Sequence, residues 1–383
     1  MKHCYGPNEP DTAPMTRREF LCSAGAGLGV IGLQAVLAEG GLFVSHAIAQ
    51  VVLLKDLQEP PAPLPDAMPK LSPLLVDDAG NVITTQAGWV KQRDALKMKW
   101  HTFMGEFPKE KAPLKAEVLA TEELPDFTRQ YVKYQIEEGV FTDGYLLTPK
   151  HASGKLPAVV AFHQTVATQA KQVAGVDTSN PELMQGVQLV KRGYVVICPR
   201  CFIFDEGAGY ADNVKRMQAL HPNWTGMARM TYDGVRAVDY LESLPHVDKN
   251  RIGCIGHSLG AKEALYAAAF DERYKVTVFS EGGIGLTFSN WDAVWYLGAD
   301  IKQPDFNMEH HQVISLIAPR AFLLLAGNSS DDDRSWAFIE AFMPVYKLLD
   351  AANNIGWFNH RMGHSYPPNA QAVAEAFLDK HLK

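Results

Sequence analysis

The stretch Arg251-Ile252-Gly253-Cys254-Ile255-Gly256-His257-Ser258-Leu259-Gly260 joins a short apolar run to a G-x-S-x-G pentapeptide. The residues after it, 261–270, are rich in alanine and leucine and indicate a helix. A chain that turns from strand to helix at one serine has no room for β-carbons two positions before and after it, which explains both glycines. This context predicts that Ser258 lies on a sharp turn with its hydroxyl exposed as a nucleophile.

Short apolar runs alternate with amphipathic segments on both sides of this turn. Such alternation is typical of a mainly parallel sheet that is covered by helices on both faces. Two more polar segments, 131–136 and 139–148, come first and suit an antiparallel hairpin. We therefore expect an α/β protein with an eight-stranded, mainly parallel sheet. The remaining expected strands are 157–163, 194–198, 251–256, 275–280, 320–326 and 355–359, and the expected helices are 89–107, 182–192, 227–244, 259–270, 335–349 and 370–381.

A serine hydroxyl is a weak nucleophile at neutral pH and needs a base with a pKa near ~6.5, which is usually histidine. Of the thirteen histidines, His364 lies in a loop with glycine and proline after the last expected strand. We predict that His364 is the base, with His360, nearer the strand end, as the second choice. His163 and His257 flank other strand ends, where we expect structural, hydrogen-bonded histidines.

The third group should be a carboxylate that holds the imidazole in one tautomer. The loop after the strand at 320–326 contains Asp331 and Asp333. We prefer Asp331, because it lies about one turn before the helix that begins near Ser335. Asp333 remains an alternative, although it is better placed to cap that helix.

Negative charge that develops on a carbonyl oxygen needs donors fixed in advance. The amide of Leu259, at the start of the expected helix, is one candidate. The amide of Gln164, after the strand at 157–163, is the other.

Two long segments, 165–181 and 282–308, are expected over the carboxyl ends of the strands, where open α/β sheets bind ligands. Trp291, Trp295 and Tyr296 in the second segment either stack on a sugar ring or anchor the loop.

With these residues placed, the chain from about Trp89 to its end resembles the α/β-hydrolase superfamily, and within it bacterial dienelactone-hydrolase-like and acetyl-xylan-esterase-like proteins. The similarity also rests on four further segments, which are 89–93, Phe162-His163-Gln164-Thr165, 247–253 and Phe270-Asp271-Glu272-Arg273. The resemblance implies a serine esterase without metal or cofactor, with Ser258, Asp331 and His364 as its triad.

Two features of this resemblance limit what is carried over. Dienelactone hydrolases use cysteine where this chain has Ser258, which disfavours lactone opening. Some carbohydrate esterases of this fold take their acid from the preceding strand, which makes Glu281 a third candidate.

The expected reaction is cleavage of a carboxylic ester, such as a carbohydrate acetyl ester, through an acyl-enzyme. The alternatives are a peptidase of the same fold, disfavoured because no propeller or large cap is present, and a non-catalytic binding module, disfavoured by the complete triad.

The first fifty residues have the order of an export signal. Thr16-Arg17-Arg18-Glu19-Phe20-Leu21 precedes a Gly/Ala-rich apolar stretch and then Ala47-Ile48-Ala49. The paired arginines look like a twin-arginine signal, which implies export of the folded protein by that machinery to the periplasm or beyond. The glycines of the apolar stretch disfavour an uncleaved anchor. We expect a signal at 1–49, a proline-rich tether at 50–85 and one domain at 86–383.

Composition narrows the partners and excludes other sites. A net charge of −7 without a long basic run argues against nucleic acid. Cys198-x-x-Cys201 lacks the second pair that a zinc site needs, so buried thiols are expected there and at Cys254. His310 and His311 have no partners at metal-ligand spacing and are expected to pack and cap.

Overall fold

A computed structural model describes residues 57–150, 153–205 and 208–383, so the predicted signal lies outside the described residues. The described residues belong to one compact unit. Within the described ranges, no helix has the length and apolar character that crossing a bilayer requires.

The core of the unit is a nine-stranded sheet with the strand order β1-β2-β3-β5-β4-β6-β7-β8-β9. β1, β2 and β3 are antiparallel to their neighbours, and the strands from β5 through β4 to β9 run parallel. The fold class is confirmed, with one strand more than the eight expected. The strands are β1 (Glu117–Glu123), β2 (Phe127–Glu137), β3 (Val140–Pro149), β4 (Leu156–Phe162), β5 (Val195–Pro199), β6 (Val247–His257), β7 (Tyr274–Ser280), β8 (Ala321–Ala326) and β9 (Ile355–Asn359).

The additional strand, β1, has no sequence pattern that marks it as part of a core. All seven of its residues are exposed, because it forms one edge of the sheet and pairs only with β2. A strand that buries neither face lacks the alternation of apolar and polar residues on which the sequence prediction depends.

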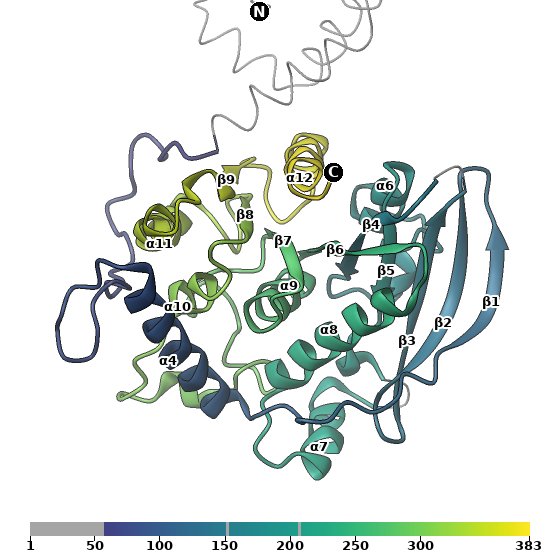
Figure 1. Ribbon diagram of the computed structural model, residues 1–383, viewed down its shortest axis with the longest axis horizontal. Coiled ribbons are helices and arrows are strands. Elements are labelled where there is room, and N and C mark those ends of the chain that lie inside the picture. The colour runs from purple at the N-terminus through teal and green to yellow at the C-terminus, as the bar shows by residue number, and fades with distance from the viewer. Residues whose placement is uncertain (1–56, 151–152, 206–207) are drawn as a thin grey trace, which may run out of the picture. The chain divides into compact units, whose positions relative to one another are not determined.

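Helices cover both faces of the sheet (Figure 1). Small residues let the central pair, α8 and α9, approach closely, since a β-carbon on Gly234 would lie 2.6 Å from the Ala267 β-carbon. All twelve residues of α9 are buried, so the helix that follows Ser258 is held firmly beneath the sheet. One face carries α8 (Gly226–Ser243), α9 (Leu259–Phe270), α10 (His310–Ser315) and α11 (Trp336–Leu348), with α4 (Gln86–Met104) against α10; the other carries α5 (Ala170–Val173), α6 (Gln185–Lys191) and α12 (Pro368–Leu382). α7 (Tyr210–Leu220) packs against the 3-10 turn Phe202–Phe204.

The proline-rich segment is docked on the domain from Leu57 onward. Leu57 and Leu74 are buried, the Trp357 amide donates to the Leu57 carbonyl at 2.7 Å, and Gln58 Nε2 donates to the Ile355 carbonyl at 2.9 Å. The start of its described part, at Leu57 and Gln58, therefore lies against β9, and the segment is packed on the domain instead of extending away as a tether.

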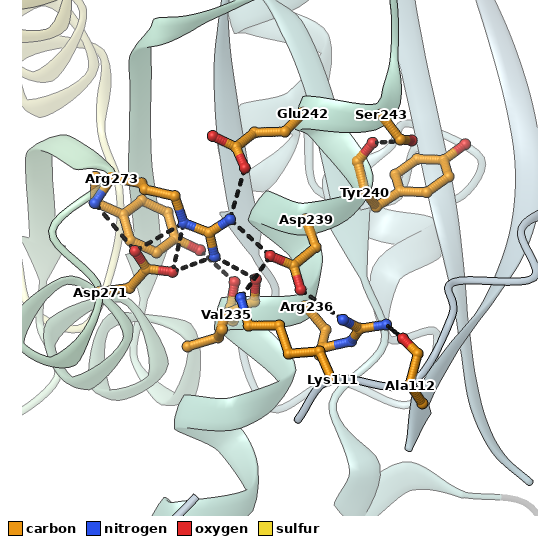
Figure 2. A network of polar contacts seen from close by, with 12 residues as sticks. Lys111, Ala112, Val235, Arg236, Asp239, Tyr240, Glu242, Ser243, Asp271 and Arg273 are labelled. Carbon is orange, nitrogen blue, oxygen red and sulfur yellow. Dashed lines mark hydrogen bonds and ion pairs between the residues drawn. The ribbon is translucent and has the colours of Figure 1, made fainter. Parts of the chain in front are cut away.

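An ionic network ties α8 to the turn between α9 and β7 (Figure 2). The guanidinium of Arg273 donates to the carboxylates of Asp271, Asp239 and Glu242. The network lies at the amino end of β7, at the opposite end of that strand from Glu281.

Candidate active site

Ser258 occupies the sharp turn that the sequence predicts. Its φ angle is +58°, a left-handed value that is rare for a residue with a side chain. A β-carbon on Gly256 would lie 2.1 Å from the Gly260 carbonyl carbon, and one on Gly260 would lie 2.3 Å from the Phe162 carbonyl oxygen. The predicted strand, turn and helix are confirmed, and both glycines are required by close backbone contact.

Two side chains from distant loops meet at Ser258. The Ser258 hydroxyl lies 2.9 Å from His364 Nε2, and His364 Nδ1 lies 3.1 Å from Glu281 Oε2. With Nδ1–H donating a hydrogen bond to the Glu281 carboxylate, Nε2 is free to accept the proton of the serine. The structure thus brings together the predicted nucleophile, the predicted base and the third-choice acid. The His364 side chain keeps 41% of its surface exposed, so the site is open on this side.

Glu281 is fully buried at the end of β7 with a φ angle of +52°. Its Oε1 accepts a hydrogen bond from the Gly327 amide, and its Oε2 accepts one from the Ser330 amide at 2.9 Å. Two backbone donors and one imidazole therefore stabilise the charged carboxylate.

The structure does not place Asp331 beside His364, contrary to the first choice made from the sequence. The amides of Gly327 and Asn328 bond to the Asp331 carbonyl, and this tight turn directs the side chain inward. The carboxylate accepts hydrogen bonds from Gly283 N and Ile284 N, both at 2.7 Å, and from Ser335 Oγ at 2.9 Å. Burial, and then the nearby charge of Glu281, raise the pKa of Asp331 to about 7.

Asp333 is also not at the imidazole. Its Oδ1 accepts from Asn359 Nδ2 at 2.8 Å and from Arg361 Nη2 at 3.0 Å. No described side chain caps α11; Asp332 caps the short 3-10 turn Asp333–Ser335 before it, where its side chain accepts from the Arg334 amide.

Three other histidines near the strand ends have structural partners. The Cys201 amide donates to His163 Nε2 at 3.1 Å, and His163 Nδ1 donates to the Gln164 carbonyl at 2.7 Å. His257 Nδ1 lies 3.0 Å from Ser280 Oγ, and His360 Nδ1 accepts from the Met362 amide at 3.1 Å. Burial lowers the pKa of His163 to about 4 and that of His257 to about 3, so both rings are neutral at pH 7.

The two expected oxyanion donors stay predictions, and the backbone around them is consistent with the role. Leu259 is the first residue of α9, where an amide has no acceptor within the helix. The contact of Gly260 with the Phe162 carbonyl presses this first turn against the end of β4, two residues before Gln164.

A buried ammonium group lies one helical turn after Ser258, and the sequence analysis missed it. Lys262 Nζ donates to Ser289 Oγ at 2.9 Å and to Asn290 Oδ1 at 3.0 Å. It also lies 4.5 Å from the ring centre of Trp291 and 4.1 Å from that of Tyr296. Burial lowers the pKa of Lys262 to about 7. The adjacent charged pair Lys262-Glu263 in an otherwise apolar helix, beginning four residues after Ser258, was the signal that could have found it.

The aromatic side chains of the long loop differ in their exposure. Trp291 is fully buried with Nε1 donating to the Gly283 carbonyl at 2.7 Å, and Tyr296 is also buried. Both anchor the loop, as one of the two interpretations expects. Trp295 is only partly buried and remains a surface that a ligand can reach.

The described ranges contain no cluster of three His, Cys, Asp or Glu side chains that could hold a metal ion. Cys198, Cys201 and Cys254 are buried and unpaired, as expected, and burial raises the pKa of the Cys254 thiol to about 12. His310 lies inside the core, where its ring accepts from the Tyr266 hydroxyl at 2.8 Å.

A serine, a histidine and a carboxylate at the carboxyl ends of parallel strands, with the serine on a strand-to-helix turn, define the α/β-hydrolase class. The profile of the Dienelactone hydrolase family matches residues 142–289. The chain is therefore a carboxylic ester hydrolase with the α/β-hydrolase fold.

Several named proteins are similar to this chain. The hydrolase YtaP of Bacillus subtilis (strain 168) is 26% identical over 240 residues, which cover 58% of this chain and 77% of that protein. A 4-O-methyl-glucuronoyl methylesterase of Hypocrea jecorina (strain QM6a) is 25% identical over 178 residues, and the match spans only 38% of its length. The solved glucuronoyl esterase from Solibacter usitatus superimposes with a TM-score of 0.68 at 18% identity, covering 84% of this chain and 100% of that chain, which is a likeness of fold.

Proposed function

We propose that the chain is an exported serine esterase that cleaves a carboxylic ester of a carbohydrate through an acyl-enzyme on Ser258. The observation that supports this most directly is the pair of contacts made by His364, at 2.9 Å to Ser258 Oγ and at 3.1 Å to Glu281 Oε2. These contacts give the serine a base and give the base a fixed tautomer.

In the proposed reaction, Ser258 Oγ attacks the ester carbonyl carbon and its proton moves to His364 Nε2. The charge of Glu281 stabilises the imidazolium, and the amides of Leu259 and Gln164 donate to the oxyanion. The carbon–oxygen bond to the alcohol then breaks, and His364 returns the proton to the leaving oxygen. A water molecule, deprotonated by His364, releases the acid and restores the hydroxyl of Ser258.

The carbohydrate can be either half of the ester. In a sugar acetate the sugar leaves as the alcohol and the acetyl group stays on Ser258. In a uronate ester the sugar itself becomes the acyl group, which is the arrangement that the names of the glucuronoyl relatives describe. The exposed side of His364 is compatible with an ester on a large carbohydrate.

The test is turnover of p-nitrophenyl acetate, together with labelling by a fluorophosphonate. We expect turnover and labelling in the native chain and the loss of both in Ser258→Ala. A screen over sugar acetates, feruloyl esters and methyl uronates then assigns the two halves of the ester. Turnover that survives in Ser258→Ala would exclude the acyl-enzyme.

A further inference from the structure

Two buried carboxylates join the loops that follow β7 and β8, because each accepts hydrogen bonds from the backbone of the other loop. Glu281, on the loop after β7, accepts hydrogen bonds from two amides of the loop after β8. Asp331, on the loop after β8, accepts hydrogen bonds from two amides of the loop after β7. The four donors are the amides of Gly327 and Ser330 for Glu281, and of Gly283 and Ile284 for Asp331. We call this arrangement the carboxylate clasp.

Stability alone does not explain the clasp. Both carboxylates have no exposed surface, and burial and the charge of Glu281 both raise the pKa of Asp331 to about 7. Two like charges in one buried region destabilise the folded state relative to apolar side chains. The clasp instead fixes the positions of the loops after β7 and β8, which lie on either side of Glu281.

The position of Glu281 requires such support. Its φ angle of +52° is unfavourable for a residue with a side chain and persists only where the surroundings impose it. Gly283 and Ile284, two and three residues after Glu281, donate their amides to the Asp331 carboxylate at 2.7 Å. Asp331 thus fixes the turn from its far side while its own carboxylate stays away from His364.

We propose that Asp331 is a positioning residue that acts through Glu281: by holding Gly283 and Ile284 it keeps Glu281 Oε2 at His364 Nδ1. This inference rests on the proposed function, in which Glu281 is the acid of the triad. None of the hydrogen bonds of the Asp331 carboxylate goes to Ser258 or His364, so its effect on them must pass through other residues.

The first experiment is Asp331→Asn, with kcat expressed per serine that a fluorophosphonate titrates. Asparagine has one acceptor oxygen, so its amide group faces a backbone N–H and one hydrogen bond of the clasp is lost. We expect kcat to fall about 10- to 100-fold, as for a small misplacement of a reacting group, with KM changed less than about 2-fold. Asp332→Asn, on the same loop but bonded only to Arg334, is the matched control and should keep the native kcat.

The second experiment combines Asp331→Asn with Glu281→Gln. If Asp331 acts through Glu281, the double variant has the kcat of Glu281→Gln within about 3-fold, because residues that act as a unit are not additive. A loss of kcat in the double variant equal to the product of the two single losses would overturn the proposal. An active Glu281→Gln beside an inactive Asp331→Asn would also overturn it, because Asp331 would then be the acid. An unchanged kcat per titrated serine in Asp331→Asn would do the same, because Asp331 would then have a structural role only.

A third readout separates the clasp from the proposed function. The downfield proton resonance of His364 Nδ1–H reports its hydrogen bond to Glu281 without any turnover. It should persist in Ser258→Ala and be lost or broadened in Asp331→Asn, and a resonance that Asp331→Asn leaves unchanged contradicts the proposal even if no ester is cleaved. If Asp331→Asn does not fold, Ser335→Ala, which removes one donor from Asp331, should lower kcat about 2- to 5-fold, and no decrease would contradict the clasp.

Discussion

Four residues with positive φ angles stand at or just after the ends of four adjacent parallel strands. They are Ser258 after β6, Glu281 after β7, Asn328 after β8 and Arg361 after β9. Each left-handed residue turns its loop sharply at the carboxyl edge of the sheet, and each costs of order 1 kcal/mol. Strain at this edge is therefore spread over the four loops after β6, β7, β8 and β9, and the first two of these residues carry side chains of the proposed triad.

His310 offers a test of how buried, neutral histidines shape stability. Its Nδ1 donates to the Ile284 carbonyl at 2.8 Å, and burial lowers its pKa from the ordinary 6.5 to about 3. Between these two pH values the unfolded chain binds a proton that the folded chain does not. Stability from this group is therefore complete above pH 6.5 and is lost as the pH falls.

For His310→Asn we expect lower stability at pH 7.5, because the bond to the Tyr266 hydroxyl is lost. The difference in unfolding free energy between native chain and variant should shrink by about 2 kcal/mol between pH 7.5 and pH 5.0, at ~1.4 kcal/mol per pH unit below 6.5. Urea unfolding at both pH values measures it. A difference that stays constant would mean that the ring is protonated inside the fold.

At the scale of elements, the sequence predicted those strands and helices that have a clear pattern of buried apolar residues. The runs that became β4 to β9 and the serine turn were found because buried strands and close-packed glycines are visible in sequence. β1 and the exposed side of α7 leave no such pattern. The choice between Glu281 and Asp331 depends on which way two adjacent loops turn, and hydrogen bonds between residues far apart in sequence decide it.

The close packing of the turn at Ser258 predicts that a single methyl group added at Gly260 strongly destabilises the fold. In Gly260→Ala the new β-carbon would lie 2.3 Å from the Phe162 carbonyl oxygen, and backbone atoms on both sides cannot move aside cheaply. We expect a loss of at least about 3 kcal/mol in unfolding free energy and loss of labelling at Ser258. Gly209→Ala is the control, since among the described residues its β-carbon would meet nothing nearer than 4.0 Å, and it should cost less than about 0.5 kcal/mol. Equal effects of both substitutions would refute the close-contact explanation.

At the scale of the whole molecule, the ionic network of Arg273 and the proposed triad acid Glu281 lie at opposite ends of β7. Arg273 and Glu281 flank this strand, roughly 25 Å apart at ~3.3 Å per residue. In Arg273→Ala the carboxylates of Asp271, Asp239 and Glu242 lose their shared guanidinium (Figure 2). We expect a loss of about 2–3 kcal/mol in unfolding free energy with an unchanged kcat for the folded fraction.

Lys215→Ala is the matched control for Arg273→Ala. Its ion pair with Asp212 is exposed on both sides, so its removal should cost less than about 0.5 kcal/mol. Thermal unfolding and ester turnover measure both variants. A lower kcat in fully folded Arg273→Ala would show that the two ends of the strand are coupled.

The buried thiols connect the fold to the proposed export route. Cys198, Cys201 and Cys254 are unpaired and enclosed by the core, so they are protected once the chain has folded and open to oxidation while it is unfolded. A chain that folds before export keeps these thiols reduced in an oxidising compartment. The paired arginines Arg17-Arg18 are the sequence feature that would direct such a route.

We therefore expect Arg17→Lys with Arg18→Lys to lower the exported amount of the full chain at least about tenfold, measured by cell fractionation and ester turnover. The exported native protein should contain three free thiols after denaturation, because the five cysteines of the chain lose Cys4 and Cys22 with the signal. Alkylation and mass measurement count them. Undiminished export of the lysine variant would exclude the twin-arginine route, and a disulfide in the exported protein would mean that the chain crosses the membrane before its core has closed around the thiols.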